Sequence, residues 1–176
     1  MLTFHTARLR LPELTPDLMQ ARLNLAPDAS GFTHTLHLDG HDHLIGVPAT
    51  WPGDALPLLP HLLAAGGPSG QFVLVRRQDR LAIGLMGQKG DPDGQGDLEI
   101  GYGLNPDARG EGYATEALRA LLPHWHDLPG VRRVTAFTAP HNPASARVLQ
   151  KAGFTHIGQA DDPDGDDGPL LWWASR

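Results

Sequence analysis

The sequence predicts a mixed α/β fold in which one parallel pair of strands joins an otherwise antiparallel sheet. The parallel pair is indicated by a strand, a helix and a strand in succession, at residues 98–104, 114–125 and 131–138. That order implies a right-handed crossover between parallel strands. The antiparallel part is indicated by residues 71–76 and 81–88, which a short polar turn joins as a hairpin.

The N-terminal region predicts a strand followed by a helix. Apolar and basic residues alternate toward the end of residues 2–11, which is typical of a strand. Thr15 followed by Pro16 is typical of a helix start, with threonine as N-cap and proline at the first helical position. We expect this helix to reach about Ala26.

The middle of the chain is harder to interpret. Residues 32–46 contain four histidines and predict no clear element. The His-Asp-His triplet at 41–43 can be read as a metal site or as a solvated turn, but the helical spacing of a metal pair is missing and no metal is expected. Residues 54–65 carry leucines at helical intervals. Pro57 fits a first turn there, whereas Pro60 is expected to kink or stop the helix.

The C-terminal half carries clear signals for helix ends. Pro123 is expected to end or bend the helix that begins near residue 114. Asn142 before Pro143 indicates a second N-cap, and Gly153 is expected just after that helix. Strands are expected at residues 154–159 and 170–173, with the acidic loop Asp161–Asp167 before the last. The elements total about seven strands and about four helices in one domain over residues 1–176.

Composition excludes several classes of function. With 40% hydrophobic and 19% charged residues the chain is globular in character, and it has no cysteine, so disulfides, thiolate metal sites and cysteine nucleophiles are excluded. A net charge of −6 argues against a nucleic-acid partner. Neither a signal peptide nor an apolar run of membrane-spanning length is present in the sequence, so we expect a cytoplasmic protein without a membrane partner.

The region between the strand at 98–104 and the following helix predicts an anion site. Its loop reads Arg109-Gly110-Glu111-Gly112. Glycines directly before a helix let an anion approach the free amides and the positive end of the helix dipole. The pattern is not a Rossmann fingerprint, because the glycine spacing fails. The strand also carries Glu99, on a face that its glycines are expected to leave open.

Two motifs together resemble the GCN5-related N-acetyltransferase (GNAT) family. The first is Arg109-x-x-Gly112-x-Ala114, at the start of a helix. The second is the helix that begins with Asn142-x-x-Ser145 and closes with Lys-Ala-Gly-Phe. The N-terminal Ala-Arg-Leu-Arg-Leu and the Glu-Ile-Gly-Tyr strand are similar to the RimJ/RimL branch of that family.

The resemblance implies acetyl-CoA as co-substrate and a parallel pair of strands that splays apart. Loop amides would hold the pyrophosphate, with Arg109 shaping the loop or adding charge. A strand backbone would pair with the pantetheine arm, and Asn142 would contact coenzyme A as well as cap its helix. The implied cofactor-binding residues are Tyr102, Gly103, Leu104, Arg109, Gly110, Gly112, Ala114, Thr115, Asn142 and Ser145.

Acetyl transfer to an amine needs the amine in its neutral form and a leaving thiolate that is tolerated or protonated. Glu99 is the candidate general base, directly or through a water, and its alternative role is a carboxylate in an ordinary ion pair. Ser145 is the candidate acid, or else a helix-start hydroxyl. Many relatives of the family carry a tyrosine acid where this chain has Leu149, so a water is another candidate, or no acid is needed because a thiol is a fair leaving group.

The expected function is therefore direct transfer of an acetyl group to a primary amine in a ternary complex. The acceptor is a protein N-terminus or a small-molecule amine such as an antibiotic or a polyamine. Residues 32–70 and the acidic loop are expected to bind it. A non-catalytic CoA-binding sensor or interaction module is the alternative, and a homodimer stays open.

Overall fold

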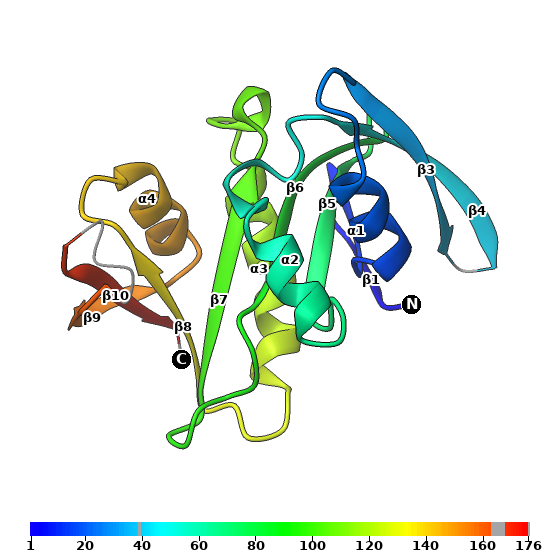
Figure 1. The fold of residues 1–176 in the computed structure, drawn as a ribbon. Coiled ribbons are helices and arrows are strands. Elements are labelled where there is room, and N and C mark those ends of the chain that lie inside the picture. The colour runs from blue at the N-terminus through cyan, green and yellow to red at the C-terminus, as the bar shows by residue number, and fades with distance from the viewer. Residues whose placement is uncertain (39, 163–167, 176) are drawn as a thin grey trace. The chain divides into compact units, whose positions relative to one another are not determined.

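The computed structural model describes residues 1–38, 40–162 and 168–175 (Figure 1). Its strands are β1 (Thr3–His5), β2 (Leu9–Pro12), β3 (Gly31–Leu38), β4 (His41–Pro48), β5 (Gln71–Arg76), β6 (Leu81–Gln88), β7 (Asp97–Leu104), β8 (Arg133–Thr138), β9 (Thr155–Ala160) and β10 (Leu170–Ser175). Its helices are α1 (Pro16–Leu23), α2 (Leu58–Ala64), α3 (Tyr113–His126) and α4 (Pro143–Lys151), with short 3-10 turns η1 (Gly53–Ala55) and η2 (Pro106–Ala108). Within these ranges no helix combines the length and the apolar character that crossing a membrane requires.

The chain divides into two compact units. The first comprises Met1–Gly87 and Tyr102–Tyr113, and the second comprises Gln88–Gly101 and Ala114–Arg176. Strand β7 therefore contributes residues to both units. The expectation of one domain over the whole chain stays a prediction.

The first unit is built on β1, β2, β5 and β6, which lie next to one another in that order and are antiparallel. The β5–β6 hairpin confirms the predicted ranges 71–76 and 81–88. Residues 32–46 form most of the β3–β4 hairpin, which projects from the sheet (Figure 1). That hairpin joins the sheet where Gly46 lies opposite Leu81 in a parallel sense.

Residues 2–11 form two strands rather than the single strand expected. A tight turn separates β1 from β2, because the Thr6 N–H donates to the Leu9 carbonyl at 3.0 Å and the Leu9 N–H donates to Thr6 Oγ1 at 2.8 Å. A threonine hydroxyl that accepts from the nearby backbone competes with a continuous strand. The described residues form ten strands, three more than the seven expected. Two of the three are the strands of the β3–β4 hairpin, and the third results from the division of residues 2–11 into β1 and β2.

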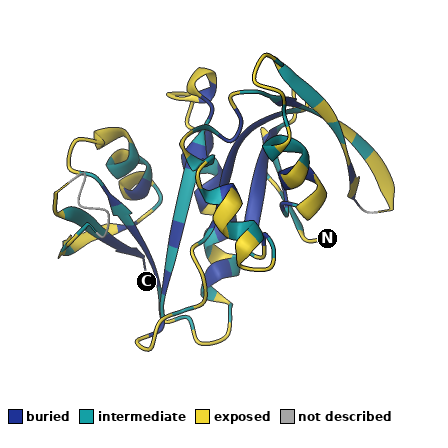
Figure 2. Ribbon diagram, in the orientation of Figure 1, coloured by how far each residue is buried: buried dark blue, intermediate teal, exposed yellow. Residues whose placement is uncertain are grey.

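Helices α1 and α2 cover one face of the first unit's sheet and enclose its core. Thr15 caps α1 as predicted, accepting from the Leu18 N–H at 3.2 Å, although the helix ends at Leu23 rather than near Ala26. Burial is continuous along β5 and β6 (Figure 2). The cluster of buried side chains consists of Leu14, Leu18, Met19, Leu36, Leu38, Ile45, Val47, Trp51, Leu59, Val73, Val75, Ala82 and Leu85.

Pro60 does not stop α2, so the expectation that the helix ends there was wrong, while a kink at Pro60 stays a prediction. It is the third residue of a helix that begins at Leu58. Amides of the first helical turn have no partner within the helix, so a proline there removes no hydrogen bond. The sequence pattern placed the helix start too early, because residues 53–55 form the separate turn η1.

The second unit contains the predicted parallel pair. Leu98 of β7 lies opposite Val134 of β8 in a parallel ladder, and β10 and β9 follow β8 with antiparallel pairing. Asp97 and Arg133 form a two-bonded ion pair across the ladder, at 2.5 and 2.6 Å. Trp173 is buried in the core, and its Nε1 donates to Thr138 Oγ1 at 2.9 Å. Splaying of the parallel pair stays a prediction.

Helix α4 has both of its predicted caps. The Asn142 side chain accepts from the Ser145 N–H at 3.1 Å. At the other end Gly153 has φ +94°, and the Gly153 and Phe154 amides donate to the Gln150 and Leu149 carbonyls at 3.1 and 3.0 Å. These two bonds define a Schellman motif, which satisfies the last carbonyl groups of the helix.

Pro123 does not end α3, which continues to His126. A proline lacks only its own N–H, so a single intrahelical bond is lost. The Asp127 N–H donates to the Pro123 carbonyl at 3.1 Å and closes the final turn. The expectation that the helix ends there was therefore wrong.

The two glycines of β7 lie in different surroundings, which gives a matched stability test. A Cβ added at Gly103 would lie 2.7 Å from the Ala55 nitrogen and 3.0 Å from the Pro52 carbonyl oxygen, both backbone atoms. At Gly101 the nearest atom would be Cε of Lys89 at 2.9 Å, the far end of a flexible side chain. Gly103→Ala is expected to lower the free energy of unfolding by about 1–3 kcal/mol, and Gly101→Ala by less than about 0.5 kcal/mol. Urea unfolding of both variants checks this, and equal losses would contradict it.

Candidate functional site

The end of β7 is fixed within the first unit by Asn105. This residue is 1% exposed, and its N–H donates to the Ile83 carbonyl at 2.9 Å. Its side-chain amide donates to the Ala82 carbonyl at 3.0 Å. The turn η2 follows directly, so the loop toward α3 leaves the sheet from a rigid point.

Arg109 shapes this loop from one side. Its Nε and Nη2 each lie 3.2 Å from the Leu104 carbonyl oxygen, and Nη2 lies 2.9 Å from Oδ2 of Asp54. The guanidinium thus binds back to the last residue of β7 and to η1. Of the two roles expected for Arg109, shaping the loop is the one these contacts support.

Gly110 and Gly112 both have φ +81°. This left-handed region costs a residue with a Cβ about 1–2 kcal/mol, so glycine is the residue that fits. A Cβ at Gly110 would meet nothing within 4 Å, so the backbone there is open to a ligand. Helix α3 begins at Tyr113, and its first amides have no partner within the helix. The loop therefore has the geometry of an anion site.

Arg8 holds the loop from another side, and the sequence did not reveal this. Its Nη1 donates to the Glu111 carbonyl at 3.0 Å, and its guanidinium lies 4.4 Å from the centre of the Tyr113 ring. The contact joins residues 103 positions apart. Alternation in the N-terminal stretch indicated only a polar position for Arg8, so no local pattern could have found it.

Arg76 lies near Tyr113, and both residues line one pocket. Arg76 forms an ion pair with Asp79, with Nη2 and Oδ2 separated by 2.6 Å. The hydrogen bond from Arg76 lowers the pKa of Asp79 below its ordinary value of 3.8. The Asp79 bond, with a smaller contribution from Tyr113, raises the pKa of Arg76, so this pair stays charged across the neutral range.

In the second unit, Glu99 lies in an ion pair. Its Oε1 is 2.7 Å from Nζ of Lys89, and the two side chains are 34% and 48% exposed. The Lys89 stem also covers Gly101, and Pro52 and Ala55 cover Gly103 in the first unit. The glycines therefore do not leave their face of β7 open as expected. They allow close packing, the other role of glycine in a strand.

The remaining expected residues of the second unit lie at helix starts. Ala114 and Thr115 are 5% and 8% exposed in the first turn of α3. Asn142 is exposed and caps α4, while Ser145 is half-buried in its first turn. Leu149, at the position of the absent tyrosine acid, is fully buried.

Comparison with known proteins assigns the family. The family described as acetyltransferase (GNAT) domain matches residues 8–155, which is most of the chain. This chain belongs to the GNAT acetyltransferase family. The uncharacterized N-acetyltransferase YjdG of Bacillus subtilis (strain 168) is 31% identical over 111 residues, covering 59% of this chain and 66% of that protein. The chain thus spans less than two thirds of the length of the curated relatives it matches.

Solved structures of GNAT proteins share the fold. A GNAT-family acetyltransferase from Bacillus anthracis covers 99% of this chain and 98% of its own, with 17% identity and a TM-score of 0.67. The aminoglycoside acetyltransferase AAC(6')-Ib, in complex with parmomycin and acetyl-CoA, covers 66% of this chain and 69% of its own, with 24% identity and a TM-score of 0.51. These similarities confirm the predicted fold class, and the RimJ/RimL branch stays a prediction.

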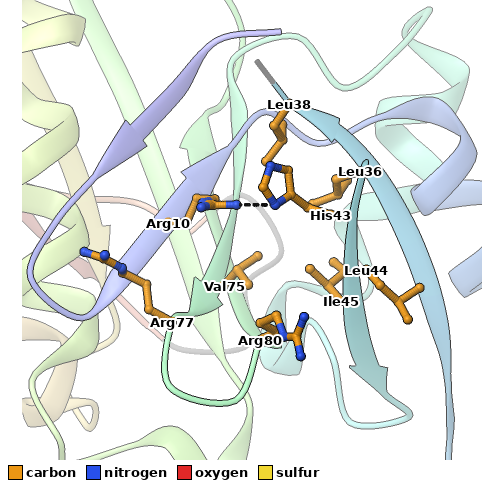
Figure 3. A pocket seen from close by; sticks show the side chains of 9 residues that line it. All are labelled: Arg10, Leu36, Leu38, His43, Leu44, Ile45, Val75, Arg77 and Arg80. Carbon is orange, nitrogen blue, oxygen red and sulfur yellow. Dashed lines mark hydrogen bonds between the residues drawn. The ribbon is translucent and has the colours of Figure 1, made fainter. Parts of the chain in front are cut away.

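This GNAT chain also has a basic pocket beside the β3–β4 hairpin (Figure 3). Its volume is about 260 Å³, and it is lined by three arginines and by several apolar side chains. Arg10 lies 2.8 Å from Nδ1 of His43. The lining residues are Arg10, Leu36, Leu38, His43, Leu44, Ile45, Val75, Arg77 and Arg80. Positive charge repels a protonated amine, so this pocket does not suit a cationic acceptor.

The histidines near this pocket form no metal site in the parts of the chain that the structure describes, where no three metal-ligating side chains gather. His41, Asp42 and His43 begin β4 rather than forming a turn. Asp42 instead lies 2.7 Å from Nδ1 of His37 across the hairpin. Most of the acidic loop Asp161–Asp167 lies outside the described residues, and its expected role stays a prediction.

The Arg76–Asp79 pair predicts a pH-dependent stability. Because the folded-state pKa of Asp79 is depressed, its contribution is present above 3.8 and is lost as the pH falls through the folded-state value. Asp79→Asn is expected to be less stable than the parent at pH 7, with a difference that shrinks below pH 3.8. Urea unfolding at several pH values between 7 and 2.5 checks this. Asp28→Asn, at an exposed turn, is the control, and a difference that does not change with pH would refute the assignment.

Proposed function

We propose that this chain is an acetyl-CoA-dependent N-acetyltransferase that moves an acetyl group directly to a primary amine in a ternary complex. The observation that carries the proposal is the loop before α3. It has two left-handed glycines, carbonyl groups bonded to arginines, and a helix N-terminus directly behind it. Membership of the GNAT family supports the same function.

The loop amides would bind the pyrophosphate of coenzyme A. Gly110, Gly112, Ala114 and Thr115 stand at the start of α3, where amide groups and the helix dipole favour a negative charge. Arg109 would hold the start of the loop in place by binding the Leu104 carbonyl, and it would not contact the ligand itself. The arginine contacts to the Leu104 and Glu111 carbonyls would pre-organise the loop and so reduce the conformational entropy lost on binding.

The backbone of residues 102–104 would pair with the pantetheine arm. Strand N–H and C=O groups point along the sheet plane, perpendicular to the side chains. The contact of η1 with Gly103 therefore closes one face of the strand. It does not block the N–H and C=O groups at the strand edges. One edge of β7 faces β6. The opposite edge of Tyr102, Gly103 and Leu104 is the one assigned to the ligand.

Glu99 would accept the proton of the attacking amine. When bound, acetyl-CoA supplies an acetyl thioester that an amine can attack. An α-amine has a pKa of about 8 and a lysine amine about 10.4, so either is largely protonated at neutral pH. Glu99, directly or through a water, would take that proton. The 2.7 Å contact with Lys89 occupies one carboxylate oxygen, and the second oxygen is the one assigned to the proton transfer.

Asn142 and Ser145 would serve the coenzyme from the start of α4. The Asn142 side chain already accepts from the Ser145 backbone, which holds the first turn of the helix in place. The Ser145 hydroxyl would then hydrogen-bond the coenzyme sulfur or protonate the leaving thiolate. Leu149 cannot supply a proton, so Ser145 or a water is assigned that role.

The acceptor is a protein N-terminus or a small-molecule amine. The N-terminal Ala-Arg-Leu-Arg-Leu and the Glu-Ile-Gly-Tyr of β7 favour a RimJ/RimL-like enzyme that acts on protein N-termini. The solved complex of AAC(6')-Ib with parmomycin illustrates a GNAT protein with an aminoglycoside, and such a small amine is the second candidate. We further propose a cytoplasmic, single-domain protein over residues 1–176.

Calorimetry and a turnover assay test this function. Acetyl-CoA titrated into the protein is expected to bind, and amines or peptides are expected to release free thiol from it. Binding without thiol release from any acceptor would favour the alternative, a CoA-binding sensor or interaction module, which the missing tyrosine acid supports. Absence of binding would refute both proposals.

Glu99→Gln tests the general base. The amide keeps the shape of the side chain and cannot take a proton, so turnover is expected to fall by about 100-fold or more. The rates are measured from pH 6 to pH 9, and an unchanged rate across this range would remove Glu99 from the mechanism. Lys89→Gln is the matched variant, because it breaks the same ion pair and keeps the carboxylate. If both variants lose activity equally, the ion pair is structural and Glu99 is not the base.

A further inference from the structure

A second basic pocket adjoins the loop before α3 on the side that Arg8 holds. Its volume is about 390 Å³, and its walls come from the β1–β2 connection, the end of β5 and the first residue of α3. The lining residues are Ala7, Arg8, Arg76, Arg77, Gln78 and Tyr113. We propose that this pocket binds the 3′-phosphate of coenzyme A, with Arg77 as the residue that recognises it. This inference rests on the proposed function.

Arg77 is positioned by backbone contacts. Its N–H donates to the Arg8 carbonyl at 2.9 Å, and its Nη1 donates to the Thr6 carbonyl at 3.0 Å. Carbonyl oxygens fix the guanidinium without carrying a full negative charge. The fork of remaining N–H groups matches phosphate oxygens, which arginine binds through two parallel hydrogen bonds.

The other polar groups of the pocket suit a phosphate monoester. Arg76 remains charged, because its bond with Asp79 raises its pKa. Gln78 adds an uncharged amide at the rim. The Arg8 guanidinium lies over the face of the Tyr113 ring. A phosphate monoester carries about −1.5 to −2 charges near neutral pH, so it is attracted to the guanidinium groups of Arg8 and Arg77.

The pocket lies where the covalent structure of coenzyme A requires a second anion site. One ribose carries both the 5′-pyrophosphate and the 3′-phosphate, so the two groups are near neighbours. Tyr113, a wall of the pocket, directly follows Gly112 of the pyrophosphate loop. Arg8, another wall, bonds to the Glu111 carbonyl at 3.0 Å.

The pocket of Figure 3 is the competing anion site of the first unit. It contains Arg77 as well, but its other basic residues are Arg10 and Arg80, and it opens beside the β3–β4 hairpin. Arg80 has φ +59°, and its carbonyl accepts from the Gly46 N–H at 3.0 Å. None of its lining residues belongs to the loop before α3. Because Arg77 lines both pockets and Arg80 lines only the pocket of Figure 3, the substitution of Arg80 is the one that distinguishes them.

The test compares coenzyme A with 3′-dephospho-coenzyme A by calorimetry on the full chain. The parent protein is expected to bind coenzyme A at least about tenfold more tightly, because the hydrogen bonds to the extra phosphate are charge-assisted. Arg77→Gln should remove most of this preference while leaving the dephospho ligand's affinity unchanged. Arg80→Asn removes one positive charge from the same turn, and asparagine tolerates its left-handed conformation, so the preference should remain.

Each outcome has a distinct meaning. Equal affinity of the parent for the two ligands overturns the inference and leaves the proposed function intact, because coenzyme A still binds. Failure of both ligands to bind refutes the proposed function instead. A preference that disappears in Arg80→Asn and persists in Arg77→Gln assigns the 3′-phosphate to the pocket of Figure 3 and overturns the inference. Because the ratio of the two affinities is the readout, a general loss of folded protein does not imitate the expected result.

Discussion

The loop before α3 depends on two guanidinium groups that bind its carbonyl oxygens. Arg109 binds the Leu104 carbonyl, where β7 ends, and Arg8 binds the Glu111 carbonyl, just before the helix begins. Carbonyl oxygens near an anion site repel its ligand, and arginine contacts neutralise that repulsion. The same contacts hold the loop between its left-handed glycines. Together these contacts fix the local geometry that suits an anion.

The distribution of charge matters more than its total. The chain carries a net charge of −6, which by itself indicates cationic rather than anionic partners. In the first unit, however, two pockets are lined by arginines from the N-terminal strands and the β5–β6 turn. An electrostatic field falls off within about 10 Å at moderate salt, so a ligand at the loop responds most to the charged groups that lie near it.

Glu99 illustrates how one residue type can serve two roles. The sequence offered a general base or a carboxylate in an ion pair, and the structure shows the ion pair with Lys89. An exposed pair of this kind contributes little to stability, typically less than about 1 kcal/mol. The ion pair therefore contributes little to the stability of the fold. It occupies one carboxylate oxygen of Glu99, and the second oxygen is the one assigned to the proposed chemistry.

The sequence by itself determined the features that depend on neighbours along the chain. The caps at Thr15, Asn142 and Gly153, the β5–β6 hairpin and the parallel β7–β8 pair all follow from short-range backbone chemistry and periodicity. It placed a loop and a helix start at residues 109–114 for the same reason. Tertiary structure alone decided the partner of Arg8, the ion pair of Glu99 and the covering of the β7 glycines. Those contacts join distant segments, and neither spacing nor composition records which segments meet.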